Sequence, residues 1–202
     1  MTRVAFIGAG SVVFTRHLLG DILAFPELQS IEIALHDIDP GRLDTAEAMA
    51  RATARELGAS PRVTSHLDRA AALDGADYVL NMVQIGGHEA TLKDFDIPER
   101  YGVSQTIADT LGIGGIFRAL RTAPHMLALG NEMAELCGDA WLLNYTNPMS
   151  MLTWLLYEGT PTDKVVGLCH SVPYTVETIG EITGVPANEI TFLAAEIGRA
   201  HV

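Results

Sequence analysis

The stretch that decides the fold is residues 4–11, VAFIGAGS, near the start of the chain. Its first four residues are apolar and predict a buried strand, and the Gly-Ala-Gly-Ser that follows predicts a tight turn. Residues 12–25 have helical spacing and end before Pro26. This order is typical of a dinucleotide site, because Gly8 permits the turn, Gly10 lets the backbone approach a pyrophosphate, and the helix N-terminus favours its negative charge.

The glycine fingerprint is incomplete, but a carboxylate further along supports the same site. Val13 stands where the third glycine of G-x-G-x-x-G would fall. Asp37 follows the next apolar run, where a carboxylate can accept hydrogen bonds from both adenosine ribose hydroxyls and would repel a 2′-phosphate. NAD is therefore favoured over NADP. Two alternatives stay open: a plain glycine turn beside a solvated Asp37, or Asp39 in its place, although Pro40 indicates that Asp39 opens a turn.

The rest of the chain alternates strand-like and helix-like segments. Strands are predicted at 4–7, 31–35, 63–66, 78–83, 140–143 and 164–168, and helices at 12–25, 41–57, 67–73, 90–101, 117–136, 149–157 and 176–183. This alternation predicts an α/β fold, a Rossmann-like doubly wound sheet that is mostly parallel, with helices on both faces. Ligands of such sheets bind outside the carboxyl ends of the strands.

Composition excludes several classes of protein. The chain has 202 residues, a net charge of −12 and 48% hydrophobic residues, which excludes intrinsic disorder. The acidic balance argues against a nucleic-acid partner, and no apolar run is long enough to predict a membrane span. The N-terminal sequence does not resemble a secretory signal. Two cysteines cannot form a disulfide framework, so we expect a cytoplasmic protein.

Polar residues follow the last two predicted strands, on the edge where a cofactor would lie. Asn144 and Asn147 follow 140–143, where amides can orient substrate hydroxyls or simply form a turn before Pro148. Cys169 and His170 follow 164–168. A thiolate can bind a divalent metal and an imidazole can bind a metal or shuttle protons, although a lone cysteine is more often a small buried side chain. Cys137 fits that structural interpretation.

Two further segments attract attention. Residues 105–110, QTIADT, lead into Gly112-Ile113-Gly114-Gly115, and this stretch is interpreted as a functional loop because it is too polar and too glycine-rich for a core. His88, Glu89 and Asp94 could face the site or form a solvated helix face. Arg118 and Arg121 could bind an anionic group, but a solvated pair of charges is the favoured interpretation.

Five long stretches together resemble glycoside hydrolase family 4, and within it the α-galactosidase group. They are FIGAGSVVFTRHLLGDIL, NMVQIGGHEATLKDFDIPERYGV, QTIADTLGIGGIFRALRTAPH, LLNYTNPMSMLTW and VGLCHSV. The resemblance implies cleavage of an α-glycoside, a small-molecule substrate, by redox and elimination steps that need NAD and a divalent metal, typically Mn²⁺. The family is an exception to the usual scheme of two catalytic carboxylates. The family also tends to form homo-oligomers.

The resemblance also implies roles for single residues. Cys169 matches the family's metal-binding cysteine, and His170 matches the position of its acid group, where a histidine favours unphosphorylated glycosides. Asn147 matches a sugar-binding amide, with Asn144 beside it, and Asp109 matches an aspartate of the substrate region. The positions implied for NAD are Gly8, Gly10, Ser11 and Asp37, to which we add Gly86, after the strand at 78–83.

The far end of the chain departs from the family. A histidine metal ligand and a tyrosine base are expected downstream, and residues 196–202, EIGRAHV, match neither. Their letters equal the translation of a common sequencing adapter. We therefore expect a truncated NAD-binding domain over 1–195, with the second, C-terminal domain missing and a read-through tail over 196–202. His201 is not assigned as a ligand, and the 202-residue chain itself is expected to be inactive.

Other functions remain open. Within the same family the alternatives are an α-glucosidase or an α-glucuronidase. A malate- or lactate-type NAD dehydrogenase shares this kind of sheet and an Asn-Pro turn, although the Cys169-His170 pair and the QTIADT segment argue against it. A non-catalytic NAD-binding domain is the third possibility.

Overall fold

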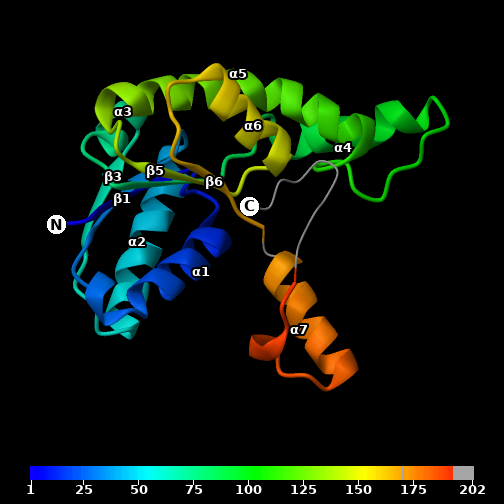
Figure 1. Ribbon diagram of the computed structural model, residues 1–202. Helices are drawn as coiled ribbons and strands as arrows, with labels where there is room; N and C mark the ends of the chain where they lie inside the picture. The colour runs from blue at the N-terminus through cyan, green and yellow to red at the C-terminus, as the bar shows by residue number, and fades with distance from the viewer. Residues whose placement is uncertain (170, 193–202) are drawn as a thin grey trace.

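The computed structural model describes residues 1–169 and 171–192, and its centre is a six-stranded parallel sheet (Figure 1). The strands are β1 (Arg3–Ile7), β2 (Glu32–His36), β3 (Arg62–His66), β4 (Tyr78–Asn81), β5 (Trp141–Asn144) and β6 (Val165–Gly167). Their order is β3-β2-β1-β4-β5-β6, and every neighbouring pair is parallel. The order reverses at β1, so the predicted doubly wound sheet is confirmed, and the crevice beside β1 is where such sheets bind ligands.

Helices cover both faces of the sheet (Figure 1). The helices are α1 (Val12–Leu23), α2 (Pro40–Glu56), α3 (Arg69–Leu73), α4 (Gly87–Glu99), α5 (Gly112–Leu136), α6 (Met149–Gly159) and α7 (Ser171–Thr183), with short 3₁₀ turns at Pro26–Leu28 and Ala187–Glu189. Of these, α1 and α2 pack on one face, and α3, α5 and α6 on the other.

Strand β1 shows how the sequence produces two cores. Successive side chains of a strand point to opposite faces, so Val4 and Phe6 join the cluster with α1 and α2, and Ala5 and Ile7 join the cluster with α3, α5 and α6. These four residues are buried, as expected for a strand between two helical layers. An apolar run without alternation is therefore what the central strand needs.

Most predicted elements are confirmed, with ends shifted by a few residues. Helix α5 begins at Gly112, five residues before the predicted start at 117. Gly114 and Gly115 are buried in its first turns, so the interpretation of 112–115 as loop is wrong. A Cβ atom at Gly114 would lie 2.7 Å from the Ala108 Cβ, and one at Gly115 would lie 2.8 Å from the Thr110 carbonyl oxygen. These glycines allow close packing of the helix on the preceding segment.

Helix α7 differs from the others in its surroundings. It has no buried residue, and Figure 1 shows it apart from the layered body. It begins at Ser171, five residues before the predicted start. No helix in the part of the chain that the structure describes is both long and apolar enough to cross a membrane. The suspected tail, 196–202, lies outside the described residues.

Candidate functional site

The turn after β1 is held against the end of β2. The backbone N–H groups of Gly8 and Ala9 both donate to the carbonyl oxygen of His36, at 3.0 and 2.9 Å. Gly8 has φ +90°, and a Cβ atom there would lie 3.2 Å from the Met82 carbonyl oxygen. Only glycine meets both conditions without strain. The chain can therefore turn sharply out of β1 and run close beside the end of β4.

Gly10 and Asp37 lie in direct contact across this turn. The Gly10 N–H donates to Oδ2 of the Asp37 carboxylate at 2.8 Å, and Asp37 Oδ1 accepts from the Asp39 N–H at 3.0 Å. Asp37 is buried, and a Cβ atom at Gly10 would lie 2.8 Å from its Cγ. Two backbone donors thus fix the carboxylate at the carboxyl end of β2, and each oxygen keeps a lone pair for a further donor.

Asp39, the other candidate carboxylate, has a structural role at the start of α2. Asp39 is the N-cap of α2, and its side chain accepts from the Arg42 N–H at 2.9 Å, the usual role of aspartate at a helix start. Asp39 therefore opens the helix, as Pro40 indicated, and Asp37 is the residue against the glycine turn.

A surface pocket lies between the starts of α1 and α2. It is lined by Gly10, Ser11, Val12, Val13, Asp39, Gly41, Arg42 and Thr45. The Ser11 side chain, at the N-cap of α1, makes no capping hydrogen bond, so the positive end of that helix faces the pocket. Val13 is 70% exposed. A third glycine is not required at position 13, because its side chain points to solvent rather than into the helix–strand contact.

A second polar cluster lies at the ends of β4 and β5. Asn81 donates through Nδ2 to Asn144 Oδ1 at 3.0 Å and to the Thr146 hydroxyl at 3.1 Å. The Asn144 amide in turn donates to the Thr146 carbonyl oxygen and accepts from the Thr146 N–H. All three residues are buried. The structure gives Asn144 a role in shaping the turn after β5 and does not support its direct contact with a substrate.

Asp109 and Asn147, predicted separately, lie together. The Asn147 amide donates to Asp109 Oδ2 at 3.4 Å, and the Thr110 hydroxyl donates to Asp109 Oδ1 at 2.9 Å. Arg118 joins them, since its Nε donates to the Asn147 carbonyl oxygen at 3.2 Å. Burial lowers the pKa of the Arg118 guanidinium, whereas the nearby Asp109 carboxylate raises it. The result is a partly buried group of one amide, one carboxylate and one guanidinium beside the end of β5.

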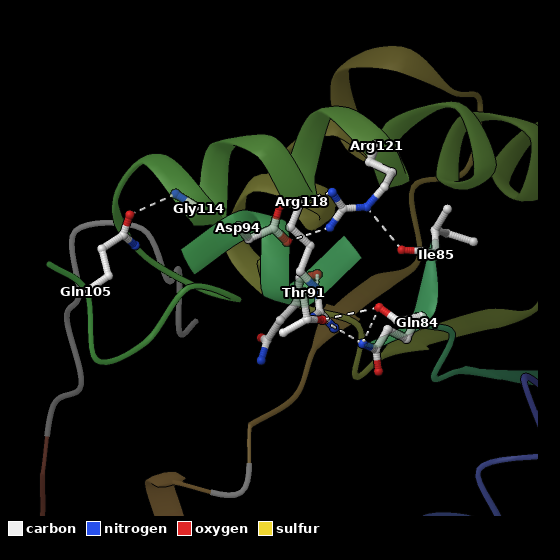
Figure 2. A network of polar contacts seen from close by, with 10 residues as sticks. Gln84, Ile85, Thr91, Asp94, Gln105, Gly114, Arg118 and Arg121 are labelled. Carbon is white, nitrogen blue, oxygen red and sulfur yellow. Dashed lines mark hydrogen bonds and ion pairs between the residues drawn. The ribbon is translucent and has the colours of Figure 1, made fainter. Parts of the chain in front are cut away.

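Arg121 is buried more deeply than the interpretation of Arg118 and Arg121 as solvated charges allows, and that interpretation is wrong. Its guanidinium forms a two-pronged ion pair with Asp94, at 2.6 and 3.0 Å, and its Nε donates to the Ile85 carbonyl oxygen at 3.1 Å (Figure 2). Asp94 is 1% exposed. A signal was present in the sequence, because Asp94 lies midway between the buried Ala90 and Pro98 at a spacing of four residues, one face of a helix.

Gly86 occupies the loop between β4 and α4. It is the N-cap of α4 with φ +86°, and a Cβ atom there would lie 3.1 Å from the Arg121 Cδ. Figure 2 shows two residues of this loop: Gln84, which contacts Thr91, and Ile85, whose carbonyl oxygen faces Arg121. The loop therefore reaches the same edge of the sheet as the glycine turn, because β4 is the neighbour of β1.

Cys169 follows β6 and is half-buried, with its Sγ 2.8 Å from the Ser171 hydroxyl. His170, its predicted catalytic neighbour, lies outside the described residues. Over 1–169 and 171–192, no three His, Cys, Asp or Glu side chains lie close enough to hold a metal ion. These residues alone therefore do not fit a complete Mn²⁺ site, and Cys169 offers one soft donor. The structural interpretation of Cys137 is confirmed: it is buried, and burial raises its pKa to about 11.

Comparisons with known proteins agree with this geometry. The chain is 46% identical to an α-galactosidase of Bacillus subtilis over 185 residues, 91% of this chain and 43% of the relative. It is 39% identical to an α-galactosidase of Rhizobium meliloti, over 98% of this chain and 40% of the relative. The solved structure of lplD of Bacillus subtilis, described as a glucosidase, superimposes with a TM-score of 0.82 at 30% identity, covering 91% of this chain and 41% of that one.

The chain spans less than half the length of these relatives. Malate dehydrogenases share the fold at TM-scores of 0.65–0.66 and only 14% identity. The family model that matches this chain is not that of the dehydrogenases. It is the model described as family 4 glycosyl hydrolase, and it matches residues 3–185. The chain belongs to family 4 of the glycosyl hydrolases.

Proposed function

We propose that the whole protein hydrolyses α-galactosides with the help of NAD and a divalent metal, and that this chain supplies the NAD-binding half of the site. The observation that carries the proposal is the contact of Gly10 with Asp37 beside the uncapped start of α1. It fits NAD, because the turn leaves room for a pyrophosphate at the helix start and the Asp37 carboxylate can accept from ribose hydroxyls. The identity to two α-galactosidases supports the choice of substrate.

The residues of this chain would divide the work along the carboxyl edge of the sheet. Gly8, Gly10, Ser11 and Asp37 would hold the adenosine and pyrophosphate, and Gly86 would border them. Bound NAD would supply a reversible hydride acceptor next to the sugar. Asp109 and Asn147 would orient sugar hydroxyls, since one accepts hydrogen bonds and the other both donates and accepts them.

For the metal site, this chain provides one proposed ligand. Solved relatives include a 6-phospho-β-glucosidase of Thermotoga maritima with manganese, NAD and glucose 6-phosphate, and a 6-phospho-α-glucosidase with NAD and Mn²⁺. We propose Cys169 as one ligand of such a metal in this protein and His170 as the acid beside it, with the other ligands supplied from sequence beyond these residues. We also propose a cytoplasmic location and a homo-oligomeric parent protein.

Isothermal titration calorimetry of the 202-residue chain tests the cofactor assignment. We expect the wild-type chain to bind NAD more tightly than NADP. The variant Asp37→Asn should bind NAD more weakly, and its affinities for NAD and NADP should be closer to each other, because the charge that repels the 2′-phosphate is removed. Equal binding of both cofactors by the wild-type chain would contradict the role of Asp37.

Activity requires a separate test. The 202-residue chain is expected not to cleave a nitrophenyl α-galactoside, and turnover by it would overturn this expectation. The chain joined to its natural downstream sequence should cleave it only with NAD, Mn²⁺ and a reductant, since oxidation of the Cys169 thiolate would remove a ligand. α-Glucoside, α-galacturonide and 6-phosphoglucoside substrates belong in the same panel, because relatives with those activities are 32–36% identical. Faster cleavage of any of these would replace the α-galactoside assignment.

A further inference from the structure

Helix α5 reaches two loops of the carboxyl edge through two arginines placed three residues apart. Arg121 donates to the Ile85 carbonyl oxygen in the loop after β4, and Arg118 donates to the Asn147 carbonyl oxygen in the loop after β5. Residues three apart lie on the same side of a helix. The loop that borders the glycine turn and the loop that carries Asn147 are thus both attached to one rigid element.

The Arg121 side chain has little freedom to move. Both of its terminal nitrogens are bonded to Asp94, whose side chain is 2% exposed, and the Arg121 side chain is itself only 27% exposed. A buried carboxylate that lost this partner would be strongly disfavoured, so the ion pair fixes the guanidinium relative to α4. The third donor, Nε, is the one that reaches the loop.

The loop packs directly on this arginine. Gly86 has a positive φ, and the space where its Cβ atom would stand is closed by the Arg121 Cδ at 3.1 Å and by the Ala90 Cβ at 2.6 Å. On its other side the same strand end approaches the glycine turn, since a Cβ atom at Gly8 would lie 3.1 Å from Val83 Cγ1. The position of the loop after β4 is therefore determined by Arg121 on one side and borders the cofactor turn on the other.

We propose that Arg121 is a positioning residue for cofactor binding: it holds Ile85 and Gly86 in the shape that NAD requires, with Asp94 serving to orient the arginine. The inference rests on the proposed NAD site. Arg121 and Asp94 lie more than 80 residues along the chain from the glycine turn. The inference gives this pair a function in cofactor binding, in addition to the stability that an ion pair provides.

The chain offers a matched control for a purely structural ion pair. Arg3 pairs with Glu32 at 2.7 Å and also donates to the carbonyl oxygens of Ala71 and Ala72, with side-chain exposures of 18% and 11% for the two partners. This pair lies at the amino ends of β1 and β2, the opposite edge of the sheet. Its burial and its bonding resemble those of Arg121, but it touches neither loop.

The test compares three variants of the 202-residue chain by calorimetric NAD titration. Arg121→Met combined with Asp94→Asn removes the contact with Ile85 without leaving a lone buried charge, so the variant can fold. We expect its NAD affinity to fall about tenfold, the effect of having to order the loop on binding. Arg121→Lys should recover part of this loss, because an ammonium can still reach the carbonyl. The matched double variant, Arg3→Met combined with Glu32→Gln, should lower the melting temperature but leave NAD affinity within about twofold.

Hydrogen exchange gives a second measurement that does not need the cofactor. The Ala90 N–H donates to the Gly86 carbonyl oxygen at 3.4 Å and reports on the loop, whereas the Tyr145 N–H donates to the Asn81 carbonyl oxygen at 2.9 Å and serves as reference. In the double variant, exchange should accelerate at Ala90 relative to Tyr145.

The outcomes separate this inference from the proposed function. Wild-type NAD affinity in the double variant would overturn the inference and leave the NAD site standing. A wild-type chain that binds no NAD would contradict the proposed cofactor site, and the cofactor role of Arg121 would fall with it, leaving the exchange experiment to test only whether Arg121 holds the loop. Faster exchange at Ala90 would support positioning by Arg121, and unchanged exchange would overturn it.

Discussion

Replacing Gly10 by alanine is the sharpest test of the cofactor turn. The new methyl group would lie 2.8 Å from the Asp37 Cγ and 2.9 Å from the Arg42 Cβ, both shorter than any normal contact between carbon atoms. Either the turn moves away from β2 or Asp37 leaves its place. In both cases the hydrogen bond from the Gly10 N–H to Asp37, now 2.8 Å long, is lost or stretched.

The size of the effect follows from these two terms. Overpacking in a closed region costs about 1–3 kcal/mol, and loss of a hydrogen bond to a charged group costs about 1.5–3 kcal/mol. Because a displaced carboxylate recovers part of this by binding water, we expect the free energy of unfolding to fall by about 2–4 kcal/mol in total. For a chain of this size that corresponds to roughly 5–15 °C in melting temperature.

Gly20→Ala is the matched control, in the helix that follows the glycine turn. Gly20 lies inside α1, and no atom stands within 4 Å of its potential Cβ position. Alanine there should raise stability by about 0.5–1 kcal/mol, because glycine loses more backbone entropy in a helix. Thermal melts and NAD titration of both variants provide the assay. Stability and NAD affinity in Gly10→Ala equal to those of the wild type would refute the close approach of the turn to Asp37.

Three further predictions concern groups away from the turn. At pH 8, iodoacetamide should modify the half-buried Cys169 well before Cys137, whose pKa burial raises to about 11, and mass spectrometry of the peptides would show the order. Burial, followed by the nearby Arg69, lowers the pKa of His125 from 6.5 to about 4, so its contribution to stability is present above pH 6.5 and falls as the pH drops from 6.5 towards 4. The variant His125→Gln should flatten that part of a pH–stability curve, and an unchanged slope would contradict it. Asn81→Leu removes the buried donor shared by Asn144 Oδ1 and the Thr146 hydroxyl and should cost about 1–3 kcal/mol in urea unfolding; a loss below about 0.5 kcal/mol would count against the buried network.

The glycine turn and Asp37 could be predicted from the sequence, because their structural requirements are local. The turn at Gly8 and Gly10 is visible because only glycine tolerates the backbone angle at one position and the close approach at the other. Asp37 is visible because a carboxylate directly after an apolar strand has few structural reasons to be there. Both features depend on residues near each other in the chain or on a known spacing.

The residues that sequence missed depend on distant packing. Gly114 and Gly115 look like loop residues, since glycine is a poor helix former, but contact with 108–110 outweighs that preference. In the sequence, Arg121 and Asp94 resemble ordinary surface charges. They form a buried ion pair only because α4 packs on α5, which the sequence does not reveal. The buried position of Asn144 likewise follows from Asn81, a residue of another strand.

The place of β1 in the sheet has a consequence for how the chain assembles. Strand β1 is bonded to β2 on one side and β4 on the other, so it is the only link between strands β2–β3 and strands β4–β6 within the sheet that the structure describes. Strand β1 pairs with strands that are distant from it in the sequence, and sheets that depend on such contacts fold slowly. Trimming residues 1–7 should therefore abolish cooperative folding altogether rather than merely fray one end.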